Sequence, residues 1–97
     1  MIVKRQYLKT KPVCKVTFEM AVQAQHVALV GEFNSWNESS TPMKKSKDGV
    51  FSVSLELETG REYQYRYLLD GSQWVNDDQA DKTVPTPLGN ENSVVVV

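Results

Sequence analysis

The sequence predicts an all-β fold, because apolar residues recur with the two-residue period of strands and no segment carries them at helical spacing. Residues 14–20 alternate between apolar and polar side chains, and residues 51–57 repeat this alternation just after the turn dipeptide Asp48-Gly49. A second turn dipeptide, Asp70-Gly71, separates two further strand-like runs. Strands and turn signals at this spacing indicate a β-sandwich.

Further strands are expected on either side of these two segments. Residues 27–30 form an apolar run that ends at Gly31. Residues 63–68 place three tyrosines at alternate positions, and a strand pattern resumes at residues 73–75, so a hairpin is predicted around Asp70-Gly71. The chain closes on the apolar run 94–97. The three tyrosines alternate in register with their strand and are interpreted mainly as core residues.

Length and composition are those of one globular domain. A second core is not expected in 97 residues, so residues 1–97 are interpreted as a single domain. Hydrophobic residues make up 40% and charged residues 24% of the chain, which is ordinary globular usage. No apolar run is long enough to cross a bilayer or to act as a signal peptide. We therefore expect a cytoplasmic protein without membrane contact.

The charge distribution excludes one class of partner and leaves another open. A formal net charge of −1 argues against the strong positive field that nucleic-acid binding requires. Five basic residues nevertheless precede the first acid, Glu19: Lys4, Arg5, Lys9, Lys11 and Lys15. These side chains either cover solvated strand faces or form a contact surface for another protein.

The sequence contains no cofactor or metal motif, so no cofactor is expected. The single cysteine, Cys14, cannot form an intramolecular disulfide, which fits a reducing compartment. Its place in the alternation of residues 14–20 predicts a buried small hydrophobe. The only histidine, His26, has no Ser, Cys or second His nearby and is interpreted as structural or exposed.

Residues 76–92 form a long stretch with two prolines and no periodicity, which predicts a loop that is either functional or disordered. Three acidic residues within it, Asp77, Asp78 and Asp81, lack the glycine and the terminal glutamate of a calcium-binding loop. We interpret them as members of a solvated acidic loop.

Five ordered blocks of the sequence carry a resemblance to a known family. Residues 27–36 (VALVGEFNSW) are followed by Pro42-Met43, residues 48–51 (DGVF), residues 63–71 (YQYRYLLDG) and Trp74. These blocks resemble the family 48 carbohydrate-binding modules. That family includes the isoamylase N-terminal early-set domain, the N-terminal domain of glycogen branching enzymes and the glycogen-binding domain of the AMP-activated protein kinase β subunit. The resemblance covers about residues 13–97 and leaves residues 1–12 as an N-terminal extension.

The resemblance implies an immunoglobulin-like, early-set β-sandwich that binds α-1,4-glucans such as glycogen, starch or maltooligosaccharides without catalysis. It assigns glucan contacts to six positions: Trp36, Arg66, Trp74, Leu88, Asn90 and Asn92. Two features depart from the kinase domain. Ser72 and Gln73 make the turn before Trp74 one residue longer, and Asn90 replaces a threonine.

These residue types suit recognition of a sugar. A pyranose has an apolar C–H face that packs flat on an indole. Its equatorial hydroxyls match the donor and acceptor of each Asn side chain and the five donors of Arg66. The pattern alone leaves both tryptophans open between core and binding surface. It leaves Leu88 open between loop packing and ligand contact.

Two other function classes make different demands on the sequence. A docking or regulatory module of glycogen metabolism, contacting a glycogen-metabolising enzyme or another protein, would use exposed strands or the basic N-terminal segment. A glycoside hydrolase would need paired carboxylates at a defined separation in a cleft. The acids of this chain gather mainly in one predicted loop, so we do not expect an enzyme.

Overall fold

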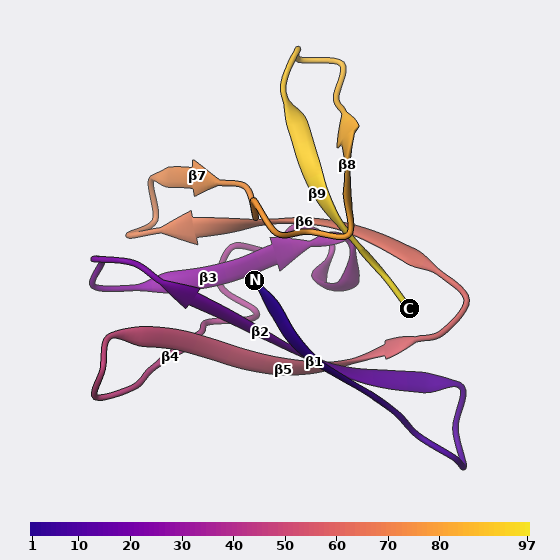
Figure 1. Ribbon diagram of the computed structural model, residues 1–97. Helices are drawn as coiled ribbons and strands as arrows, with labels where there is room; N and C mark the ends of the chain where they lie inside the picture. Colours follow the sequence, from indigo (N-terminus) through magenta and orange to yellow (C-terminus); the bar gives the residue numbers. More distant parts are fainter.

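The computed structural model describes residues 1–97 and contains two antiparallel β-sheets packed face to face (Figure 1). The first sheet has the strand order β1-β2-β5-β4, with β1 at Ile2–Tyr7, β2 at Val13–Ala21, β5 at Val50–Glu58 and β4 at Lys44–Lys45. The second sheet has the order β3-β6-β9-β8, with β3 at Val27–Gly31, β6 at Glu62–Leu69, β9 at Glu91–Val96 and β8 at Lys82–Pro85. The immunoglobulin-like, all-β sandwich expected from the sequence is confirmed.

Two smaller elements lie next to β6 and β3 in the second sheet. β7 (Gln73–Val75) pairs with the end of β6, and the short 3-10 turn η1 (Glu32–Asn34) follows β3. No helix in the structure has the length and apolarity needed to span a bilayer.

The alternating segments form the centre of the first sheet. β2 and β5 pair along nine residues, from Val13 opposite Glu58 to Ala21 opposite Val50. Their apolar positions face the core, where Cys14, Val16 and Phe18 are fully buried. The prediction that Cys14 is buried is therefore confirmed. The period of two is visible in the sequence because each strand has one face in the core and one in solvent.

The second sheet supplies the other half of the core. The predicted hairpin is confirmed as β6 and β7, and the apolar run 27–30 is part of β3. Tyr65 and Tyr67 are buried and Tyr63 is half-buried against the core, as predicted. The Tyr65 ring contacts Phe18 of the facing sheet edge to face, with centroids 5.2 Å apart.

The interpretation of residues 76–92 as a structureless loop was wrong for part of that stretch. β8 lies within it, and β9 begins at Glu91, so the segment forms a hairpin in which Val84 lies opposite Asn92. The strand pattern was hidden because β8 is only four residues long, has no buried residue and ends in proline. The edge strand β1 was not predicted either, since it carries no alternation.

The interpretation of Asp77 as part of a solvated acidic loop was also wrong. Asp77 is 5% exposed, and its Oδ2 accepts hydrogen bonds from the hydroxyls of Tyr65 at 2.7 Å and Tyr67 at 3.1 Å. The N-terminal ammonium of Met1 lies 2.9 Å from the same oxygen. Burial alone would raise the pKa of the Asp77 carboxyl, but hydrogen bonds from the ammonium, Tyr65 and the Gln79 amide hold this pKa below its usual range.

Candidate functional site

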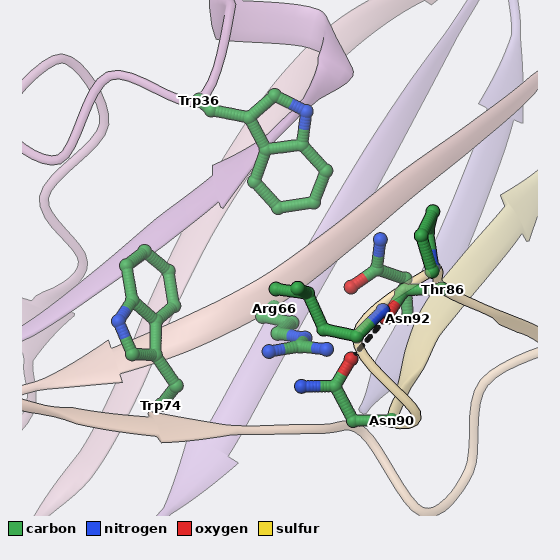
Figure 2. A pocket seen from close by; sticks show the side chains of 8 residues that line it. Trp36, Arg66, Trp74, Thr86, Asn90 and Asn92 are labelled. Carbon is green, nitrogen blue, oxygen red and sulfur yellow. Dashed lines mark hydrogen bonds between the residues drawn. The ribbon is translucent and has the colours of Figure 1, made fainter.

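The six residues that the family resemblance assigned to the site line a single surface cavity of about 480 Å³ on the second sheet. Figure 2 shows the two indoles on one side of this cavity, the amides of the β8–β9 hairpin on the other, and Arg66 between them. The lining is completed by two residues that were not predicted, Thr86 and Pro87. Four separate chain segments thus converge on one surface.

Trp36 is held outward by a locally strained turn. Ser35 and Trp36 both have left-handed backbone conformations, with φ of 56° and 58°, which cost energy in residues other than glycine. The side chain of Asn34 stabilises this turn by accepting from the Gly31 N–H at 3.1 Å and donating to the Leu29 carbonyl at 3.0 Å. The Trp36 side chain remains 38% exposed. Trp36 is therefore not a core residue.

Trp74 reaches the same cavity from β7 and is 42% exposed. It pairs with Leu68 of β6 across a turn in which Asp70 and Gly71 have positive φ. The carboxylate of Asp70 secures this turn by accepting from the backbone amides of Gln25 and His26, each at 2.9 Å. The longer turn before Trp74 is thus accommodated with the indole facing the cavity.

Arg66 occupies the floor of the cavity, at the point of β6 where its pairing changes from β9 to β7. Its Nη2 donates to the main-chain carbonyl of Glu91 at 2.7 Å. Its Nε is buried without a hydrogen-bond partner. The guanidinium is therefore anchored through one nitrogen, and fewer than its five donors are free for a ligand.

The far wall of the cavity is the tip of the β8–β9 hairpin. Residues 86–89 form a turn with Pro87 in its second position and Gly89 in its fourth, a sequence signature typical of type I turns. The backbone amide of Thr86 donates to the Asn90 carbonyl at 2.8 Å, and the Thr86 hydroxyl donates to Asn90 Oδ1 (Figure 2). This signature could have indicated Thr86 and Pro87 as neighbours of Asn90.

Leu88 and Asn92 differ in how firmly they are held. Leu88 is 89% exposed at the hairpin tip, so it does not pack the loop. Asn92 lies nearer the sheet and donates from Nδ2 to Gln64 Oε1 at 2.9 Å. Asn92 Oδ1 therefore remains to accept a hydrogen bond from a ligand. In Asn90 the Oδ1 already accepts from the Thr86 hydroxyl, so the amide nitrogen remains to donate. The two amides therefore present opposite hydrogen-bonding ends to the cavity.

The composition of the lining defines what this surface can do chemically. It contains two indoles, one cation, two amides and one hydroxyl, but no carboxylate. No group of three or more His, Cys, Asp or Glu side chains is placed to hold a metal ion. The lining offers flat apolar surfaces with directed polar groups between them, as expected of a surface that stacks rings and orients hydroxyls.

The comparison with known protein families agrees with this geometry. Residues 14–97 match the family described as the glycogen recognition site of AMP-activated protein kinase. The chain belongs to this family. The match begins at Cys14 in β2, so it leaves out β1 and includes the other strands of both sheets and every residue of the cavity.

The relatives of this chain are much longer proteins, and only a short segment of each matches it. Protein PTST homolog 2, chloroplastic, of Arabidopsis thaliana is 36% identical over 74 residues, which cover 76% of this chain and 13% of the relative. The 1,4-alpha-glucan branching enzyme GlgB of Aquifex aeolicus is 46% identical over 83 residues, with coverages of 76% and 12%. The chain therefore spans about an eighth of the length of these two relatives.

Proposed function

We propose that this module binds α-1,4-glucans without modifying them, through the cavity lined by Trp36 and Trp74. The observation that carries the proposal is the convergence of two exposed indoles, from different segments, on a cavity that also holds Arg66, Asn90 and Asn92. Scattered surface tryptophans would not share one cavity with three hydrogen-bonding side chains.

The chemistry of a glucan accounts for each part of this lining. Successive glucose rings stack their apolar faces on the two indoles, each of which offers a large rigid surface. The free amide nitrogen of Asn90 donates to one hydroxyl, and Asn92 Oδ1 accepts from another. Arg66 adds donors at the floor, and Leu88 at the tip covers an apolar edge of the chain. The complex is held by stacking and by hydrogen bonds to uncharged hydroxyls, without ion pairs.

The relatives support the substrate class, and the lining of the cavity supports a role without catalysis. The name of the Aquifex aeolicus relative states action on 1,4-alpha-glucan, and the matched segment is a small part of that protein. In this chain the cavity has no carboxylate in its lining, so no acid–base pair for glycoside cleavage faces a bound sugar. We therefore infer a recognition role, with glycogen or starch as the polymer.

Affinity electrophoresis tests this proposal with a matched control. The unmodified module should be retarded in a native gel that contains glycogen or soluble starch. Trp36→Ala and Trp74→Ala should migrate as in a gel without polysaccharide, because each removes a stacking surface. Tyr7→Ala is the control, since Tyr7 is also an exposed aromatic residue but lies on β1 outside the cavity.

The outcomes separate glucan binding from a purely docking role. Retardation that is lost in both tryptophan variants and kept in Tyr7→Ala supports the proposal. If neither glycogen nor starch retards the unmodified module, the proposal is contradicted. That result would favour a docking module, which contacts another protein and not the polymer.

A further inference from the structure

Asn76 lies where two strands meet end to end along one edge of β6. β9 pairs with the first half of β6 as far as Tyr65, and β7 pairs with its last residues from Tyr67 onward. Arg66 is the β6 residue between these two pairings. Asn76 follows β7 directly and is not among the residues that line the cavity.

The side-chain amide of Asn76 joins the end of β7 to β9. Its Nδ2 donates to the Glu91 carbonyl at 2.8 Å, and its Oδ1 accepts from the Ser93 backbone N–H at 3.1 Å and the Ser93 hydroxyl at 2.9 Å. A carbonyl can only accept and a backbone N–H can only donate, so these partners fix the orientation of the amide. The contact continues through the Asp77 N–H, which donates to the Ser93 hydroxyl at 2.8 Å.

This contact sits at the root of the hairpin that carries most of the cavity lining. β9 pairs with β6 only from Ser93 onward, and Figure 1 shows the β8–β9 hairpin projecting beyond the body of the sandwich. Three side-chain hydrogen bonds hold the projecting part against the sandwich, namely those from Asn76 and Arg66 to the Glu91 carbonyl and that from Asn92 to Gln64. Of these donors, Asn76 alone belongs to the segment that carries Trp74.

We infer that Asn76 is a positioning residue of the glucan site, an inference that rests on the proposed function. It sets the distance between Trp74 on β7 and the hairpin amides of Asn90 and Asn92. A glucan long enough to contact both parts of the cavity gains from this fixed spacing, because the ordering cost is met before the ligand arrives. A disaccharide that rests on one part gains little from it.

The inference is tested with two variants, one control and two ligands. Asn76→Ala removes the whole contact. Asn76→Asp keeps the acceptor for Ser93 and loses the donor to Glu91, so it provides a milder test if the alanine variant does not fold. Gln79→Ala is the control, since Gln79 is an exposed amide three positions along the chain and does not line the cavity. Kd is measured for maltoheptaose and for maltose.

Loss of the contact should weaken binding of the long ligand selectively. Kd for maltoheptaose should rise about tenfold in Asn76→Ala, because the cost of ordering the released hairpin then opposes binding, and Kd for maltose should change less than about threefold. Without sugar, backbone ¹⁵N order parameters of residues 86–90 should fall from the rigid value of about 0.85 toward about 0.6. Gln79→Ala should leave all three quantities unchanged.

Failure of this inference is distinguishable from failure of the proposed function. If the unmodified module binds maltoheptaose and both Asn76 variants bind it equally well, the positioning role is wrong and the glucan site remains. If the affinities for maltose and maltoheptaose fall by the same factor while the hairpin stays rigid, Asn76 acts only through general stability, which also overturns the inference. If the unmodified module binds neither sugar, the proposed function itself fails.

Discussion

Asp77→Ala should destabilise the module strongly, although Asp77 lies outside the cavity. The substitution leaves the hydroxyls of Tyr65 and Tyr67 buried, at 0% and 1% exposure, without their shared acceptor. An unsatisfied buried polar group costs about 1–3 kcal/mol, so the expected loss is about 2–6 kcal/mol. Domains of this size have a free energy of unfolding of about 5–15 kcal/mol. The loss therefore removes a large fraction of the total.

Urea unfolding followed by circular dichroism measures this loss, and a rescue variant tests its cause. Adding Tyr65→Phe and Tyr67→Phe to Asp77→Ala deletes the orphaned hydroxyls and should recover at least about 1 kcal/mol, because removing both partners of a hydrogen bond is nearly neutral. The reasoning is refuted if Asp77→Ala loses less than about 1 kcal/mol. It is also refuted if the two phenylalanine substitutions recover nothing.

Two further predictions concern the same core. Burial and the neighbouring Asp77 raise the pKa of Tyr65 and Tyr67 above the usual value, so the stability they contribute is complete below pH about 10 and falls above it. Each tyrosine should lower the free energy of unfolding by about 1.4 kcal/mol per pH unit, and urea titrations should show that Tyr65→Phe flattens this decline. Gly31→Ala should lower the melting temperature by at least about 4 °C, since an added Cβ would lie 2.5 Å from the Gln64 carbonyl oxygen and 2.8 Å from Tyr65 Cβ. Melting within about 2 °C of the unmodified module would show that β3 moves away freely.

The fold was predictable where strands have one buried face. β2 and β5 alternate because one face of each packs in the core, and the glycine turns mark the ends of the strands. β1 and β8 were missed because neither contains a buried residue, so no period appears in their sequences. The burial of Asp77 was missed because it depends on tyrosines 10 and 12 residues away and on the chain start.

The candidate site was predictable only through the family resemblance. Residue patterns alone left Trp36 and Trp74 open between core and surface, and no local signal shows that two indoles 38 positions apart share a cavity. That arrangement depends on β6 pairing with both β3 and β7. The role of Asn76 was not predictable for a similar reason, since its partners Glu91 and Ser93 lie 15 and 17 positions along the chain.

The most direct test of glucan binding uses the fluorescence of the two tryptophans, which are the only ones in the chain and both line the cavity. Titration with maltoheptaose should shift the emission saturably as sugar replaces water on the indole faces. The midpoint should change little between low and high salt, because the sugar is uncharged and forms no ion pair that salt would screen. Trp36→Ala should abolish the response while keeping its melting temperature, whereas loss of a core tryptophan would cost about 3–5 kcal/mol. An emission spectrum that stays unchanged at saturating maltoheptaose would contradict the proposed site.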